Sequence, residues 1–160
     1  MDTDSLFRLL RAFEQEGLEY ALIGAAALNL HGIIRATEDM DILIKATEKN
    51  VARLKQALHA VYDDPDIEQI TAEDLLGEYP AVRYYPPGND LFLDILTRLG
   101  EAATYEDLEI EERDIEGTRV QLASPGSLYR LKKDTLRPID RMDAEALRER
   151  FDLDSEQDDE

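Results

Sequence analysis

The chain contains no cysteine and only two histidines, His31 and His59. The absence of cysteine excludes disulfide bonds, thiolate catalysis and any zinc site with cysteine ligands. Two histidines also argue against a histidine-rich metal site. A metal ion in this protein would therefore depend on carboxylate ligands, which suit hard cations such as Mg²⁺.

Long apolar runs are missing as well. No stretch of about 18 consecutive apolar residues occurs, so the sequence predicts no transmembrane helix. Residues 1–5 lack the basic and then apolar pattern of a secretory signal peptide. We therefore expect a cytoplasmic protein without a membrane partner.

Basic residues are scarce, because 18 lysines and arginines stand against 37 acidic residues and give a formal net charge of -19. Nucleic-acid binding draws much of its affinity from basic side chains that displace counterions at phosphates. The chain repels a polyanion on average, which disfavours a tRNA or DNA substrate, although a local basic surface could still bind one. A protein or small-molecule substrate is mildly favoured.

The length and composition fit one folded domain. A chain of 160 residues with 43% hydrophobic residues can bury a proper core. We expect a single domain over residues 1–151. Residues 152–160 hold six acidic side chains in nine positions and are expected to form a disordered tail.

Periodicity, caps and turn residues predict an α/β (α+β) fold, with a small mixed sheet flanked by helices. The expected elements are a helix over residues 5–16 with Asp4 or Ser5 as its cap, strands over 19–23 and 40–45, a helix over 25–32, a helix capped by Thr47 and ended by Asp63–Asp66, a short helix over 72–78, strands near 81–86 and 91–97, a hairpin from Leu108 to Leu122 that turns at Glu116 and Gly117, a helix that starts at Pro125 with Ser124 as its cap, and a last helix from Pro138 to about Phe151.

Asp39 and Asp41 are the most informative residues, because they lie two apart on a predicted strand. Side chains alternate across a strand, so both carboxylates point to one face. Nearby carboxylates repel and raise each other's pKa unless a cation or proton intervenes. Mg²⁺ is commonly held by one or two carboxylates together with substrate phosphates. In so acidic a chain, a solvated surface pair is the alternative. The apolar side chains of the other face are Met40, Ile42 and Ile44.

A second signal precedes these acids. Residues 20–32 read as a short buried strand that breaks at Gly24 and continues into an alanine-rich helix. Small residues at such a turn leave the first helical N–H groups accessible to an anionic phosphate. The alternative is a tight strand–helix joint without a ligand.

Asp94 is a single carboxylate within the apolar strand from Leu91 to Leu96. An unpaired ion on a buried strand costs several kcal/mol or titrates to neutrality. Asp94 therefore needs a partner. The partner would be the proposed cation or, alternatively, the guanidinium of Arg83 or Arg98.

Other residues have weaker signals. His31 with Gly32 is typical of a helix C-terminus rather than of a catalyst. Arg35 could bind a phosphate with two hydrogen bonds or neutralise nearby acids, and Thr37 lies in the same loop. Lys132 could reach a bound triphosphate or be a surface lysine. Tyr84 and Tyr85 could stack on a base but are more typical of strand packing.

Together these residues resemble the signature of nucleotidyltransferases of the DNA polymerase β-like superfamily, and most closely the small proteins that include the AbiEii-type abortive-infection toxins. The resemblance spans about residues 18–148. One departure is Ala25, where the family usually has a second glycine or serine. The matching positions are Ile23-Gly24, His31-Gly32, Arg35, Thr37, Asp39-x-Asp41, Asp94, residues 123–128, Leu131-Lys132, Arg137, Asp140 and Asp143.

The resemblance implies a polymerase β-like fold and transfer of a nucleoside monophosphate from a nucleoside triphosphate to an acceptor hydroxyl. Asp39 and Asp41 would hold Mg²⁺ or Mn²⁺, and Asp94 would complete a second metal site or orient the acceptor. A cognate antitoxin is the implied protein partner. The alternative is a catalytically silent relative that binds a nucleotide or a partner. The implied nucleotide-binding residues are Gly24, Ala25, Ala26, Arg35, Thr37 and Lys132.

Overall fold

The computed structural model describes residues 3–32, 39–77, 80–88, 92–99, 103–133 and 138–153, with the backbone alone at residues 3, 132–133 and 138–141. The predicted arrangement of helices and strands is confirmed with small shifts at element ends. The helices are α1 (Thr3–Glu16), α2 (Gly24–Leu30), α3 (Glu48–Val61), α4 (Ala72–Leu76), α5 (Pro125–Lys133) and α6 (Pro138–Phe151), with short 3₁₀ turns η1 (Pro65–Gln69) and η2 (Tyr105–Asp107). The strands are β1 (Tyr20–Ile23), β2 (Asp39–Ile44), β3 (Ala81–Tyr84), β4 (Phe92–Leu96), β5 (Ile110–Ile115) and β6 (Thr118–Ala123).

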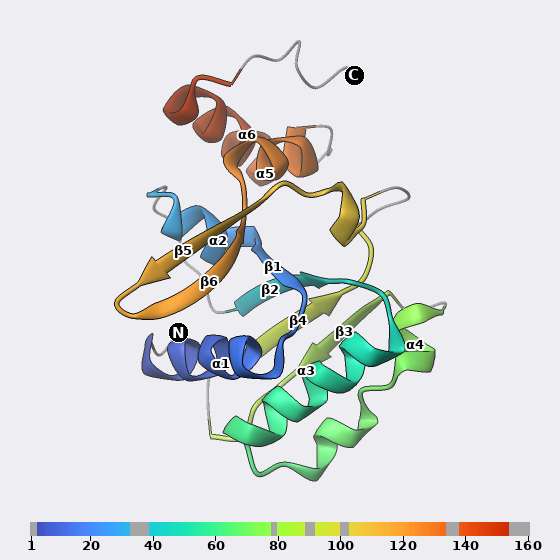
Figure 1. Ribbon diagram of the computed structural model, residues 1–160. Coiled ribbons are helices and arrows are strands. Elements are labelled where there is room, and N and C mark those ends of the chain that lie inside the picture. Colours follow the sequence, from blue (N-terminus) through green and yellow to red (C-terminus); the bar gives the residue numbers. More distant parts are fainter. Residues whose placement is uncertain are drawn as a thin grey trace.

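The described strands form one mixed sheet in the order β3-β4-β2-β1-β6-β5 (Figure 1). The pairs β2–β4 and β1–β6 are parallel, and the other neighbours are antiparallel. Strand β2 therefore lies in the interior of the sheet, between β4 and β1. This position surrounds its acidic residues with neighbouring strands.

Helices α1 and α3 lie side by side against one face of the sheet, whereas α5 and α6 pack together beyond α2, at the top of the view in Figure 1. The ring of Phe13 on α1 meets Tyr20 edge-to-face, with 5.0 Å between centroids. Tyr20 pairs with Ile44 across the sheet, so α1 covers the face of Ile44 and Ile42. The acidic residues of β2 consequently point to the opposite face.

Local sequence explains most element ends. The Thr47 hydroxyl caps α3 by accepting a hydrogen bond from Asn50 N at 3.1 Å. The β5–β6 hairpin turns through Glu116 and Gly117, whose φ angles of 51° and 81° match a type I′ turn. Ser124 Oγ accepts from Ser127 N at 3.1 Å and caps α5.

Three expected boundaries differ from the structure. Helix α1 begins at Thr3, before the expected caps, and this places Asp4 in its first turn, where a carboxylate is favourable. Strand β3 ends at Tyr84 because the following Pro86 has no N–H to donate. Helix α4 ends at Leu76, before Gly77. Residues 154–160 of the expected acidic tail lie outside the described part of the chain.

Within the described ranges, the helices are too short or too polar to cross a membrane.

Candidate active site

The register of the sheet builds one row of side chains across four neighbouring strands. Arg83 on β3 pairs with Asp94 on β4, Asp94 pairs with Asp41 on β2, and Asp41 pairs with Ile23 on β1. Residues paired in this way point to the same face of a sheet. Asp39 lies two positions before Asp41 and shares that face. The predicted convergence of the acids is therefore present in the structure.

The carboxylates of Asp39, Asp41 and Asp94 are called the acidic cluster below. One oxygen from each lies within 4.8 Å of the other two. All three residues are partly exposed, whereas Met40 and Ile42 on the opposite face are fully buried. The apolar residues of β2 thus anchor the strand while its acids face an open site.

Asp41 has the most strained electrostatic environment in this cluster. Burial, followed by repulsion from Asp39 and Asp94, raises the pKa of Asp41 to about 8. Its buried Oδ1 atom has no hydrogen-bond partner among the described residues. A buried polar atom without a partner is costly, and a divalent cation would satisfy this oxygen and relieve the repulsion. The residues present therefore fit a hard-cation site.

Gly24 lies directly beside this cluster. Its φ of +70° belongs to the left-handed region, and a Cβ atom there would lie 3.1 Å from Asp41 Cγ and closer still to Oδ2. Helix α2 starts at this residue, and its N-cap residue, Ile23, makes no side-chain hydrogen bond to the first turn. The first N–H groups of α2 belong to Gly24, Ala25 and Ala26. They therefore lie at the end of the helix that is next to the Asp41 carboxylate.

Asp94 is paired with one arginine through two hydrogen bonds. Arg83 Nε donates to Asp94 Oδ1 at 2.8 Å, and Arg83 Nη2 donates to Oδ2 at 3.2 Å. The guanidinium of Arg83 also stacks on the Phe92 ring, 4.3 Å from its centroid. Of the two arginines considered from the sequence, Arg83 is the ion-pair partner, while Asp94 also belongs to the acidic cluster.

Phe92 was not expected at the site from the sequence. The available signal was its position two residues before Asp94 on the same strand, which places both side chains on one face. The neighbouring tyrosines differ: Tyr84 is buried and donates to Asp64 Oδ2 at 2.7 Å, as expected for packing. Tyr85 is 64% exposed and lies near Phe92, with 5.6 Å between ring centroids.

A cavity of about 270 Å³ opens beside Asp41 and Asp94. Its polar groups come from these two acids and from Arg83. The remaining lining side chains are apolar, and they are Ile23, Ala81, Leu96 and Leu99.

His31 is structural, as its position after α2 predicted. It is 4% exposed, and its Nδ1 accepts from Arg113 Nη2 at 3.1 Å. Its Nε2 therefore has the proton and donates to Ala123 O at 2.8 Å. Burial, the largest cause, lowers the pKa of His31, and the charge of Arg113 lowers it further. Arg150 on α6 donates to the His31 carbonyl at 2.9 Å.

Several expected residues are not placed by the structure. Arg35, Thr37 and Arg137 lie outside the described residues, and the same holds for the side chains of Lys132 and Asp140. Their proximity to the acidic cluster remains a prediction.

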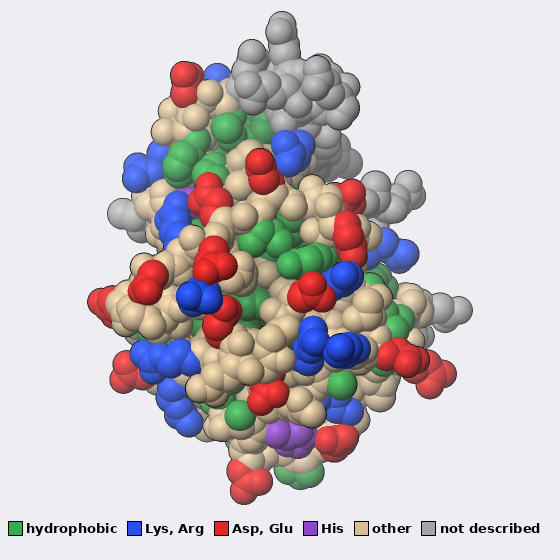
Figure 2. All heavy atoms as spheres, viewed as in Figure 1, with side chains coloured by type: hydrophobic (Ala, Val, Ile, Leu, Met, Phe, Trp, Pro, Cys, Tyr) green, Lys and Arg blue, Asp and Glu red, His purple; other side chains and the backbone are tan. Residues whose placement is uncertain are grey.

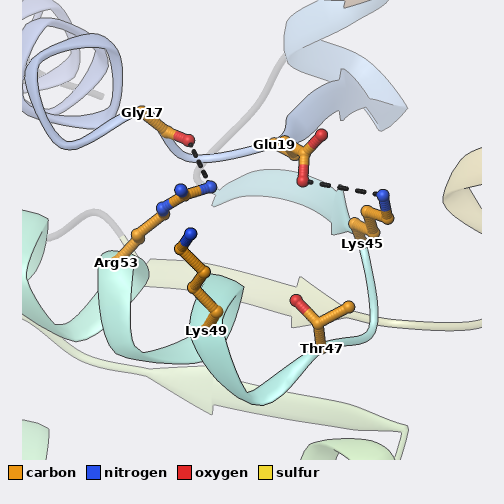
Figure 3. Close-up of a pocket in the computed structure, with 6 residues that line it drawn as sticks. All are labelled: Gly17, Glu19, Lys45, Thr47, Lys49 and Arg53. Atoms are coloured by element: carbon orange, nitrogen blue, oxygen red, sulfur yellow. Dashed lines mark hydrogen bonds and ion pairs between the residues drawn. The ribbon is translucent and has the colours of Figure 1, made fainter.

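A second hollow, of about 570 Å³, lies at the other end of β2 (Figure 3). Lys45, Lys49 and Arg53 project toward it together with Glu19, and Lys45 follows directly after the last residue of β2. Lys45 lies 3.9 Å from Glu19, and Arg53 donates to the Gly17 carbonyl at 3.3 Å. In Figure 2, basic side chains gather over the N-terminal half of α3 among scattered acidic ones. The basic surface is thus remote from the acidic cluster.

Comparison with known families decides the assignment. The model of the family described as "Nucleotidyl transferase AbiEii toxin, Type IV TA system" matches residues 6–146. The chain belongs to the AbiEii nucleotidyltransferase family. It is accordingly a nucleotidyltransferase, as the sequence resemblance predicted. A comparison with curated proteins finds no match.

Two solved structures share the fold of this AbiEii family member. The crystal structure of ANT(2'')-Ia in complex with adenylyl-2''-tobramycin is 14% identical, with a TM-score of 0.58 over 99% of this chain and 94% of that one. A solution structure of the antibiotic-resistance factor ANT(2'')-Ia is 16% identical, with a TM-score of 0.51 over 95% of this chain and 93% of that one. At these identities the likeness establishes the nucleotidyltransferase fold.

Proposed function

We propose that the acidic cluster transfers a nucleoside monophosphate from a nucleoside triphosphate to an acceptor hydroxyl in a reaction that requires Mg²⁺ or Mn²⁺. The main support is the convergence of three carboxylates within 4.8 Å, one of which has a buried oxygen with no hydrogen-bond partner among the described residues. Asp39 and Asp41 would hold the cation, and Asp94 would contribute to a second cation or orient the acceptor. When bound, the cation would offset the charge on the triphosphate and on the departing pyrophosphate.

The proposed chemistry is a single displacement at the α-phosphorus. The acceptor oxygen forms a bond to this phosphorus while the bond to the bridging oxygen of the β-phosphate breaks, and pyrophosphate leaves. Asp94 lies beside the cavity and would accept the hydroxyl proton. In the cation-free protein both oxygens of this carboxylate accept hydrogen bonds from Arg83, so Asp94 would act after this pair opens.

The phosphates would bind at the start of α2. The N–H groups of Gly24, Ala25 and Ala26 are proposed donors, because they are in the first turn of the helix and the N-cap residue, Ile23, makes no side-chain hydrogen bond to them. Helix α2 has only seven residues, so individual N–H groups rather than a helix dipole would provide the binding. Arg35, Thr37 and Lys132 are proposed to complete the phosphate site.

A protein or small-molecule acceptor is favoured over nucleic acid. The cavity beside Asp94 is mostly apolar, and Arg83, the basic residue that lines it, is already paired. The second hollow, which is lined by Lys45, Lys49 and Arg53 and could attract phosphates, lies at the other end of β2. The adenylylated tobramycin in the ANT(2'')-Ia structure is an example of a small-molecule product on this fold. The same proposal includes a role as a toxin, a cognate antitoxin as partner, a cytoplasmic location and a single domain over residues 1–151.

A catalytically silent relative is the second candidate, and the Arg83–Asp94 ion pair is the observation that favours it. An arginine that permanently occupies Asp94 would prevent this acid from acting. Such a protein would still bind nucleotide or a partner.

Incubation with nucleoside triphosphates labelled on the α-phosphate, Mg²⁺ and cell extract separates the two candidates. A labelled product that requires Mg²⁺ and is missing with the Asp39→Asn, Asp41→Asn double variant supports transfer. Nucleotide binding without any labelled product from protein, RNA or small-molecule fractions would support the silent relative instead.

A further inference from the structure

Arg83 contributes the guanidinium at the end of the row that contains Asp94 and Asp41. Strand β3 is the outermost strand on this side of the sheet, so Arg83 reaches the acids from an edge. Its side chain is 50% exposed, whereas that of Asp94 is 23% exposed. The positive group can therefore move toward solvent more readily than the carboxylate can.

Both oxygens of Asp94 accept a hydrogen bond from Arg83, at 2.8 and 3.2 Å. Such a two-point pair is the strong form of an arginine–carboxylate interaction. It occupies lone pairs that a cation would need. By contrast, Oδ1 of Asp41 is free of hydrogen bonds from described residues. The two acids thus differ in how ready they are to bind a cation.

We propose that Arg83 is a built-in counter-ion of Asp94. The guanidinium pairs with this carboxylate in the cation-free protein and releases it when a divalent cation binds. The inference rests on the proposed cation site. Arg83 stabilises the cluster before cation binding, because it offsets negative charge among three neighbouring carboxyl groups. It also competes with the cation for Asp94. After its release from Asp94, the guanidinium would remain stacked on the Phe92 ring beside the site.

The proposal predicts opposite effects on two quantities. Removing Arg83 lowers the thermal stability of the cation-free protein and raises its affinity for the cation. A residue that only positions Asp94 for binding would give a loss of cation affinity instead. The sign of the change in affinity therefore separates the two roles.

The experiment measures the affinity for Mn²⁺ in the absence of nucleotide. Each variant is titrated with Mn²⁺, and binding is monitored by electron paramagnetic resonance and by titration calorimetry. The variants are Arg83→Met, Arg83→Lys and, as a control for net charge, Arg98→Met, which removes an exposed arginine near the end of β4. We expect Arg83→Met to bind Mn²⁺ about three- to tenfold more tightly than the wild type, the effect of losing a partly exposed paired arginine. Arg98→Met should change the affinity by less than about twofold.

Weaker or unchanged Mn²⁺ binding by Arg83→Met, or an equal gain in Arg98→Met, would overturn the counter-ion role. If Arg83→Met does not fold, Arg83→Lys decides the question, because lysine cannot form the two-point pair and should give a smaller gain in affinity. The Asp39→Asn, Asp41→Asn variant tests the premise separately. If it binds Mn²⁺ as the wild type does, or if neither the wild type nor Arg83→Met binds, the cation site itself is wrong and the proposal falls with it.

Discussion

The backbone of Gly24 and the carboxylate of Asp41 are in such close contact that a single added carbon on Gly24 would collide with the acid. The turn that starts α2 and the strand that bears the acids are therefore fitted to each other. Any side chain at position 24 must displace Asp41 or the turn.

Gly24→Ala should destabilise the protein and weaken Mg²⁺ binding, because alanine adds both backbone strain and a collision with Asp41. We expect a loss of about 1–3 kcal/mol in the free energy of unfolding. Gly17→Ala is the matched control, since Gly17 has the same φ of +70° but no atom within 4 Å of the added carbon. Denaturant unfolding and Mg²⁺ titration of both variants measure the difference. Equal behaviour of the two variants would mean that contact with Asp41 is unimportant.

Asp39→Asn together with Asp41→Asn should abolish Mg²⁺-dependent nucleotide binding and leave the fold intact or slightly more stable. The substitutions replace two carboxyl groups that repel each other whenever both are ionised in the cation-free protein. Calorimetric titration with nucleotide, with and without Mg²⁺, and thermal unfolding are the measurements. An unfolded variant, or one with the same Mg²⁺ dependence as the wild type, would make these acids structural.

The stability of the cation-free protein should fall as the pH rises. The pKa of Asp41 is about 8 in the folded protein against an ordinary value of 3.8, so the folded state retains a proton that the unfolded state has released. This stabilisation is complete below about pH 4 and is lost progressively up to about pH 8. The melting temperature of the wild type should thus drop more steeply between pH 5 and 8 than that of Asp41→Asn, by an amount that saturating Mg²⁺ reduces. Parallel curves for the two proteins would assign the pH dependence to other groups.

Asp94→Ala should separate chemistry from binding. If Asp94 orients the acceptor or takes its proton, turnover should fall by a factor of about 10² to 10⁴, while nucleotide affinity changes little. Steady-state rates and nucleotide titrations on the same preparation test this division. Equal losses of rate and affinity would merge its role with that of Asp39 and Asp41, and an unchanged rate would leave only the ion pair with Arg83.

Lys132 and Lys133 are adjacent on α5, and adjacent positions of an α-helix are rotated by about 100° about the helix axis. If the C-terminal segment matches the family as the sequence suggests, Lys132 faces the site. Lys132→Ala should weaken triphosphate binding by about 1–3 kcal/mol, the range for a hydrogen bond to a charged group. Lys133→Ala should have almost no effect, and monophosphate binding should respond to neither. Equal or reversed effects in nucleotide titrations would exclude α5 from the phosphate site.

The parts of the site that depend on local spacing could be predicted from the sequence. Alternation along one strand was enough to place Asp39 and Asp41 on a common face, and the caps at Thr47 and Ser124 fixed where two helices begin. These features depend on neighbours within a few residues. They therefore do not require knowledge of the tertiary structure.

The partner of Asp94 could not be chosen in the same way. Arg83 and Arg98 are both near it in sequence, and only the antiparallel register of β3 and β4 puts Arg83 directly opposite. The contacts of His31 were even less accessible, because Arg113 and Arg150 lie 82 and 119 residues away along the chain. Pairing between distant segments is decided by packing, and a single sequence does not encode it in a local pattern.

Helix α2 has one end at the acidic cluster and the other end fastened to the C-terminal helix. Arg150 holds the carbonyl of His31, and the ring of Phe151 meets the His31 imidazole edge-to-face at 5.5 Å. Helix α2 has only seven residues, so one short helix connects the contacts with α6 to the backbone of Gly24 beside Asp41. Loss of the last turn of α6 would therefore remove both contacts at the His31 end of α2, the helix whose first N–H groups are the proposed phosphate donors.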